Sequence, residues 1–257
     1  MRTPFAWIVW HNIAYLVDDE HRVRAYRALE RRVGLEPKAI AAASTDDLLS
    51  IAKLGGPIAD KRVAKLKACA QLALTLGGGD LGQLLTEPTA KARRALERFP
   101  SIGAPGAEQI LLFCDAWPVL ALESNGLRVL VRLGFGVESD DYATAYRSAQ
   151  RAAASELPDQ CAPLQRAYQL LRLHGQTTCK RSEPHCTECV LATTCPSAGK
   201  VQVQRTADAP AKGPLKGPAK APAPAKAAAA PARKAKAAGA PTRNGVAKAR
   251  PARAKAK

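Results

Sequence analysis

Four cysteines form the strongest chemical signal in this sequence. They are spaced as Cys179-x6-Cys186-x2-Cys189-x5-Cys195. Thiolates grouped this closely bind either one tetrahedral zinc ion or the irons of a cubane iron–sulfur cluster. Zinc ribbons usually pair two Cys-x2-Cys knuckles, whereas only Cys186 and Cys189 have that spacing here. The wider outer gaps favour a cluster, and a structural zinc loop stays open as the alternative.

The other three cysteines, Cys69, Cys114 and Cys161, lie far apart and beside apolar residues. We interpret them as buried thiols of a protein in a reducing compartment. The part of the chain before the tail is long enough to bury a sizeable core without disulfide bonds. This excludes a small secreted cysteine scaffold and predicts a cytoplasmic protein.

No segment of the sequence has the properties of a membrane span. The longest apolar stretch, from Ile110 to Leu122, is interrupted by Asp115 and Pro118. The apolar opening segment is interrupted by His11 and is not followed by a signal-peptide cleavage site. We therefore expect no membrane partner and no export.

The net charge of +17 is concentrated at the C-terminal end. Residues 199–257 contain ten lysines and five arginines against a single acid, Asp208, so this tail carries +14 and the remainder +3. The tail is rich in Ala, Pro and Lys and poor in large apolar side chains, which predicts disorder. Such tails resemble the arms of linker histones and bind DNA through counterion release. A merely solubilising tail is the alternative.

Almost every patterned segment before the tail has helical periodicity, and no segment alternates as a half-buried strand does. The sequence therefore predicts an all-α fold. The expected helices cover residues 5–16, 18–33, 44–51, 58–75, 88–99, 105–114, 125–133, 140–157 and 162–173.

The segment Phe99-Pro100-Ser101-Ile102-Gly103 joins two of these predicted helices. A tight turn there directs backbone N–H groups, at the start of the second helix, toward a phosphate oxygen. A glycine at position 103 allows close approach of the backbone. We therefore predict that Ser101, Ile102 and Gly103 contact DNA, although such a turn is also common as an ordinary connector.

The residues from Leu173-His174-Gly175 through Pro184 to Cys195 resemble the iron–sulfur loop of the endonuclease III family of DNA glycosylases. The predicted helix-hairpin-helix turn stands at the family's distance before it, and the resemblance extends over residues 4–198. It implies two helical domains and a tail. These are a six-helix domain with the hairpin (1–117), a helical 4Fe-4S cluster domain (118–198) and the basic tail (199–257).

The resemblance also implies partners and roles. The four cysteines would hold a structural 4Fe-4S cluster, and Lys180 and Arg181 in the loop between the first two would contact DNA phosphate. The expected partner is double-stranded DNA with one nucleotide flipped into a pocket. The expected setting is base-excision repair by a monomer associated with the nucleoid.

Three positions depart from the family pattern. Pro105 stands where bifunctional members have a Schiff-base lysine, so β-lyase chemistry by that route is not expected. Glu123 replaces the essential aspartate that stabilises positive charge on the sugar. Its longer arm makes activity uncertain, and it could instead serve as a helix N-terminal residue. Leu16 replaces the glutamine that fills the space of the flipped base, and it could act as an apolar wedge.

His11 matches a general-acid glutamate of adenine-specific relatives. On an apolar helix it is more often a core residue, and we favour that interpretation.

Three functions remain open at this point. The first is a monofunctional DNA glycosylase that uses Glu123, and the second is a non-catalytic binder of damaged, bent or branched DNA on the same scaffold. The third, least favoured, is a redox-sensing or electron-transfer module.

Overall fold

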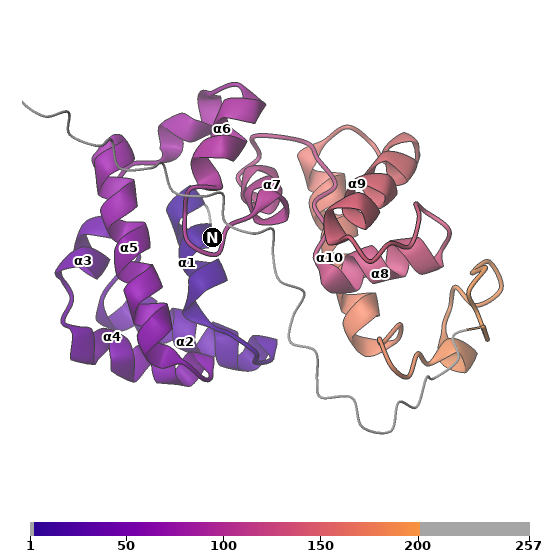
Figure 1. Cartoon of the computed structure of the whole chain (residues 1–257), viewed down its shortest axis with the longest axis horizontal. Helices are drawn as coiled ribbons and strands as arrows, with labels where there is room; N and C mark the ends of the chain where they lie inside the picture. Colours follow the sequence, from indigo (N-terminus) through magenta and orange to yellow (C-terminus); the bar gives the residue numbers. More distant parts are fainter. Residues whose placement is uncertain (1–2, 201–257) are drawn as a thin grey trace, which may run out of the picture. The chain divides into compact units, whose positions relative to one another are not determined.

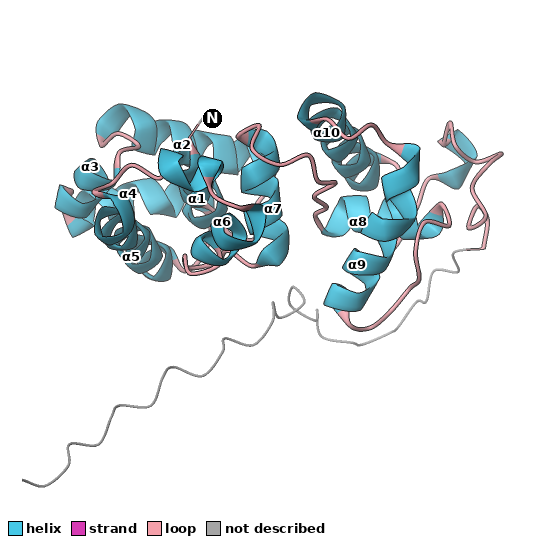
Figure 2. Ribbon diagram, turned by 90° about the horizontal axis from the view of Figure 1, so that it is seen from above, coloured by secondary structure: helices cyan, strands magenta, loops and turns pink. Residues whose placement is uncertain are grey.

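The computed structural model describes residues 3–200. Residues 201–257 of the predicted tail lie outside the described residues. The predicted disorder of the tail therefore stays a prediction. Within residues 3–200 the chain forms helices and no strand, which confirms the all-α prediction (Figures 1 and 2). The α-helices are α1 Pro4–Ile13, α2 Asp19–Arg32, α3 Pro37–Ala42, α4 Thr45–Ala52, α5 Ala59–Gly77, α6 Thr89–Leu96, α7 Ala104–Phe113, α8 Ser124–Arg132, α9 Tyr142–Ala153 and α10 Cys161–Thr177; the 3-10 turns are η1 Lys53–Gly55, η2 Gly82–Thr86, η3 Ala154–Glu156 and η4 Cys186–Glu188.

Short polar side chains fix where several helices begin. The carboxylate of Asp18 accepts from the backbone N–H of His21 at 2.9 Å and starts α2. The hydroxyl of Ser44 accepts from the N–H of Asp47 at 3.0 Å and starts α4. Such N-caps satisfy donors that have no partner inside the helix, each stabilising it by about 1 kcal/mol.

Two hydrophobic cores organise the helices. The first is built by α1 to α7 and contains the fully buried side chains of Ile8, Leu29 and Leu66. The second lies among α8, α9 and α10 and contains Leu122, Tyr146 and Leu164. Both belong to one compact unit, so the domain boundary at residue 117 remains a prediction.

The structure corrects three local predictions. The first helix ends at Ile13 instead of Leu16, because the N–H of Tyr15 donates to the carbonyl of Gly55 at 2.9 Å and draws the chain into a loop. The short α3 was not predicted, since it has only six residues and no side-chain cap. Cys69 is buried as predicted, whereas Cys114 and Cys161 are only partly buried.

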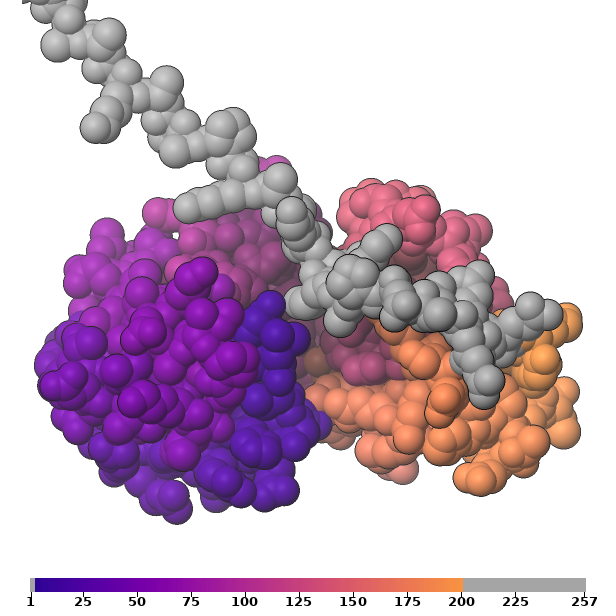
Figure 3. Space-filling model, turned by 60° about the horizontal axis from the view of Figure 1, so that its bottom comes forward, coloured from indigo at the N-terminus to yellow at the C-terminus, as the bar shows by residue number. Residues whose placement is uncertain are grey.

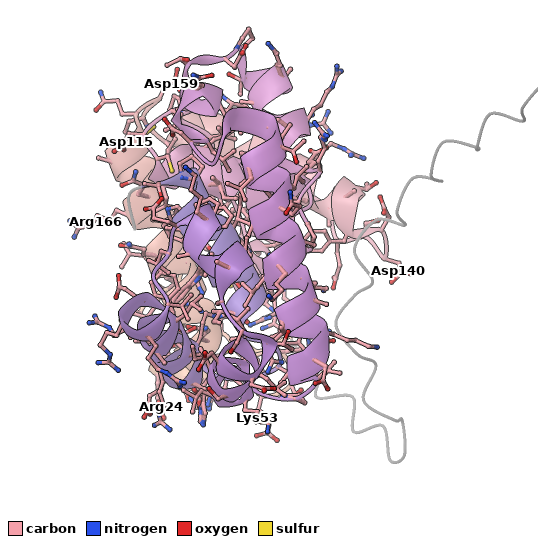
Figure 4. All side chains as sticks on the ribbon, turned by 90° about the vertical axis from the view of Figure 1, so that its left-hand side faces the viewer. Arg24, Lys53, Asp115, Asp140, Asp159 and Arg166 are labelled. Carbon is pink, nitrogen blue, oxygen red and sulfur yellow. The ribbon has the colours of Figure 1, made fainter. Side chains whose placement is uncertain are left out.

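Charged side chains cover the outside of the helices. Figure 4 shows Arg24 of α2 and Lys53 of η1 extending away from the ribbon. Among the helices described, none has both the length and the hydropathy needed to cross a bilayer.

Candidate functional site

The predicted hairpin is present between α6 and α7. Phe99 and Ile102 are 2% and 5% exposed, and they anchor the turn in the first core. The N–H of Ile102 donates to the carbonyl of Phe99 at 3.1 Å, so neither its side chain nor its N–H faces solvent. Ile102 therefore holds the turn, and the outward positions are Ser101 and Gly103.

Ser101 adopts a left-handed backbone conformation with φ +64°. Ser101 thus occupies a conformation that glycine would adopt without strain. The exposed Ser101 hydroxyl accepts from Nζ of Lys65 in α5 at 2.8 Å. From behind the turn, Nδ2 of Asn12 donates to the carbonyl of Pro100 at 2.9 Å and ties the hairpin to α1.

Gly103 precedes α7 in an extended conformation, with φ −103° and ψ −174°. A Cβ atom there would meet nothing closer than Cδ of Pro105 at 4.0 Å, so no internal contact requires a glycine. No side chain caps α7, and the N–H groups of Ala104 and Gly106 have no acceptor within the helix. The exposed start of α7 therefore offers backbone donors to an outside group, while Pro105 offers neither an N–H nor an amine.

Two apolar side chains stand exposed on neighbouring loops of the same part of the chain. Leu16 is 64% exposed with φ +53°, and Ile58 is 48% exposed with φ +57°. The loops touch at Gly55 and Gly56, where a Cβ atom would lie 2.3 Å from the carbonyl oxygen of Ile13 or 2.5 Å from that of Tyr15. A second exposed apolar side chain, Ile58, thus stands on a loop that contacts the loop of the predicted wedge Leu16.

Ile58 was missed by the sequence analysis. The sequence feature that could have indicated an exposed apolar side chain is the isoleucine directly before α5. It occupies the N-cap position, where Ser, Thr, Asp or Asn is preferred. The buried guanidinium of Arg62 holds the Ile58 loop, because it donates to the carbonyls of Ala52, Gly56 and Pro57.

Glu123 is half-buried, follows Leu122 of the second core and caps the N-terminus of α8. One carboxylate oxygen accepts from the N–H of Gly126 at 2.7 Å and the other from Nδ2 of Asn125 at 2.9 Å. This confirms that Glu123 sits at a helix N-terminus. Because both bonds hold the carboxylate in one place, the side chain is oriented although it is one methylene longer than aspartate.

Two tyrosines lie near this carboxylate. Burial, with the negative charge of Glu123 as the next cause, raises the pKa of Tyr142 to about 12. The same two causes raise the pKa of Tyr168. Arg172, one turn after Tyr168, donates to the Asp19 carboxylate of α2 at 2.5 Å. The surroundings of Glu123 therefore contain neutral phenols and the guanidinium groups of Arg172 and Arg128.

His11 lies on α1 against Gly106 of α7, where a Cβ atom would be 3.6 Å from its Cε1. Burial lowers the pKa of His11 to about 4, and the charge of Arg22 contributes to this lowering. Its Nε2 atom is buried without a hydrogen-bond partner among residues 3–200. A neutral imidazole in the first core agrees with the interpretation of His11 as a core residue.

The four clustered cysteines line one pocket that is partly open to solvent. Two arginines of α8 hold the surrounding loop. Arg128 donates to the carbonyls of Gly175 and Cys179 at 2.7 and 3.0 Å. Arg132 donates to Sγ of Cys179 at 3.3 Å and to the carbonyls of Lys180 and Arg181 at 2.7 and 3.1 Å. Arg128 thus has a structural role.

The structure brings the four cysteines to the lining of one pocket. Within residues 3–200, no three His, Cys, Asp or Glu side chains are close enough to hold a single metal ion. Lys180 and Arg181 are both exposed in the loop after Cys179, as their predicted role requires.

Comparisons with known proteins agree on one fold. No protein-family model matches the chain. The chain is 25% identical to endonuclease III of Sulfolobus acidocaldarius over 195 residues, which cover 76% of this chain and 82% of that protein. It is 26% identical to endonuclease III of Escherichia coli strain K12 over 111 residues, covering 43% of this chain and 49% of that protein.

Solved structures give the same result. A non-covalent endonuclease III–DNA complex aligns with a TM-score of 0.63 at 18% identity, covering 78% of this chain and 86% of the other. A thermostable thymine-DNA glycosylase aligns with a TM-score of 0.63 at 16% identity, with the same coverage.

Proposed function

We propose that this chain is a member of the endonuclease III-like superfamily of helix-hairpin-helix DNA glycosylases, and that it binds double-stranded DNA and removes damaged or mismatched bases as a monofunctional glycosylase in base-excision repair. The observation that carries the proposal is the oriented carboxylate of Glu123, together with the outward-facing hairpin.

The DNA-binding part of the proposal rests on two features of the first core. Ser101, Gly103 and the first turn of α7 present donors suited to a phosphate oxygen. Leu16 and Ile58 present apolar side chains suited to enter a base stack, which partly unstacks and kinks a duplex. The cations Lys180 and Arg181 add backbone contacts from the cysteine loop, which carry no sequence information.

The catalytic part of the proposal rests on Glu123. Its carboxylate would stabilise positive charge on the sugar as the bond between C1′ and the base nitrogen breaks. Water then adds to C1′ and gives up a proton, while the base leaves in protonated form. Pro105 has no amine, so no Schiff base forms at that position and strand cleavage by that route is absent.

The four cysteines are proposed to hold a 4Fe-4S cluster. A zinc ion with bonds of about 2.3 Å requires its sulfurs within about 4 Å of one another. Thiols that surround a cavity suit a cluster of several atoms better. When bound, the cluster supplies a cross-link between the end of α10 and the last part of the loop. Arg128 and Arg132 orient the loop that carries the first ligand.

The decisive test is a single-turnover base-release assay with brown, cluster-loaded protein in excess. The duplexes carry oxidised pyrimidines, uracil, or adenine opposite oxidised guanine, and alkali then cleaves the abasic sites. We expect release from at least one duplex, no cleavage without alkali, and a decrease in release of roughly 100-fold or more in Glu123→Gln. Glu123→Gln keeps an acceptor for the N–H of Gly126, so its melting temperature serves as the control for folding.

A non-catalytic DNA binder is the second candidate function. It is favoured by one observation: both oxygens of Glu123 already accept hydrogen bonds at the N-terminus of α8. Tight binding of every duplex without base release would support this candidate and direct the search to bent or branched DNA. We also propose that the protein is a monomer of the cytoplasm, associated with the nucleoid.

A further inference from the structure

Lys65 is an exposed cation on α5 that has no role in the proposed site described so far. It lies on the exposed face of α5, and its Nζ contacts the Ser101 hydroxyl in the hairpin at 2.8 Å. Among residues 3–200 it forms no ion pair with any acid. Its charge is therefore available to an outside anion.

The hydrogen bond between these side chains fixes which way the donors point. Because the Ser101 oxygen accepts from the Lys65 ammonium, the hydroxyl proton must point away from the ammonium. The ammonium retains two further N–H donors. Three donors from two side chains therefore stand free beside the solvent-facing turn.

The position of Lys65 along α5 places this pair relative to the apolar tips. Ile58 precedes the helix, and Lys65 follows seven residues later, which is about 10 Å along the axis. Lys61 lies one turn before Lys65 and is also exposed. Figure 3 shows the purple atoms of this region at the molecular surface.

We propose that Lys65 and Ser101 together form a DNA phosphate contact, about 10 Å along α5 from the apolar tip at which Ile58 and Leu16 would enter the base stack. This rests on the proposed function, since it needs a bound duplex. The pair supplies a formal charge at the hairpin, where the turn itself supplies only neutral donors. It also gives a reason for a serine at φ +64°, because a glycine would have no hydroxyl for Lys65.

The test measures the affinity of the full-length protein for a duplex containing a stable abasic-site analogue, over a range of salt concentrations. Lys65→Ala is expected to reduce the slope of log affinity against log salt by about 0.9, the value that corresponds to one bound phosphate. Lys65→Arg should keep the slope. Lys67→Ala is the matched control, because it removes the same charge from another face of α5, where Nζ donates to the carbonyl of Ala43 at 2.7 Å. Its slope should not change.

Ser101→Ala separates the contribution of the Ser101 hydroxyl to DNA affinity from that of the Lys65 charge. It keeps a Cβ atom and the same backbone strain, and it should lower affinity by about tenfold at every salt concentration while the slope stays the same. Equal slopes for Lys65→Ala and Lys67→Ala, in proteins with unchanged melting temperatures, would overturn the phosphate contact alone. A wild-type protein that binds no duplex would overturn the proposed function as well.

Discussion

Positive φ angles mark the residues that we place against DNA. Leu16, Ile58 and Ser101 are three of the four non-glycine residues with positive φ among residues 3–200, and all three are exposed. A left-handed conformation costs a residue with a side chain about 1–2 kcal/mol, so it persists only where surrounding contacts impose it. Here those contacts are the Gly55–Tyr15 hydrogen bond, the Arg62 guanidinium and the anchors of the hairpin.

His11 makes a prediction about the pH dependence of stability. In the folded protein the pKa of His11 is about 4, below its ordinary value of 6.5. Between these two pH values the imidazole is therefore protonated in the unfolded chain and neutral in the folded chain. The contribution of this group to stability is therefore complete above pH 6.5 and declines as pH falls toward 4. Between pH 7.5 and 5 the decline is about 2 kcal/mol.

Urea unfolding at these two pH values measures the effect in the wild type and in His11→Leu. Over the same interval, the free energy of unfolding should fall by about 2 kcal/mol less in the leucine variant than in the wild type. Carboxylates such as Asp18 and Asp19, whose pKa values are lowered by their hydrogen bonds, contribute equally to both proteins and cancel in the comparison. An identical decrease in both proteins would contradict a buried neutral His11.

Between elements, the packing of α8 on α10 depends on a glycine. A Cβ atom at Gly175 would lie 2.6 Å from the carbonyl oxygen of Asn125, which is backbone and cannot turn aside. We expect Gly175→Ala to destabilise the protein by about 1–3 kcal/mol through overpacking. Because Arg128 bonds the carbonyls of Gly175 and Cys179, the variant should also release the proposed 4Fe-4S cluster at a lower temperature than the wild type.

Gly77→Ala gives the matched control for that prediction. Gly77 ends α5, and nothing lies within 4 Å of the Cβ atom that the change adds. The same substitution should therefore stabilise the protein there, by up to about 1 kcal/mol. Thermal unfolding of both variants measures whether each substitution raises or lowers stability. A destabilised Gly77→Ala would show that the different effects of the two substitutions do not come from close packing.

The sequence predicted the elements better than their ends. Helical periodicity is a local property, and the structure confirms the helices that it predicts, which begin at the local caps Asp18 and Ser44 in α2 and α4. The end of α1 depends on Gly55, which lies far beyond Tyr15 along the chain, so no local pattern reveals it. The Lys65–Ser101 hydrogen bond likewise joins residues 36 positions apart. Interactions of this kind arise from packing, and they decide the exposed tips and the partners of the hairpin.

At the scale of the whole molecule, most of the positive charge lies apart from the helices. Residues 199–257 carry +14 of the net +17, and residues 1–198 carry only +3. DNA binding through the hairpin and the cysteine loop involves few cations, so these two regions predict a weak salt dependence on their own. Strong, salt-dependent DNA binding by the full chain would therefore come chiefly from its C-terminal segment.

Deletion of residues 201–257 separates the two contributions. We expect the truncated protein to bind duplex DNA with a much flatter salt dependence, since the slope falls by about 0.9 for each phosphate that the protein no longer neutralises. We also expect the full-length and the truncated protein to prefer an abasic over an intact duplex, because both contain Leu16, Ile58 and the hairpin. Fluorescence anisotropy with both duplexes, from low to physiological salt, measures slope and preference together. If the salt dependence of binding is unchanged by the deletion, the C-terminal segment is only a solubilising tail. If the truncated protein no longer prefers the abasic duplex, the C-terminal segment and not the hairpin recognises the damage.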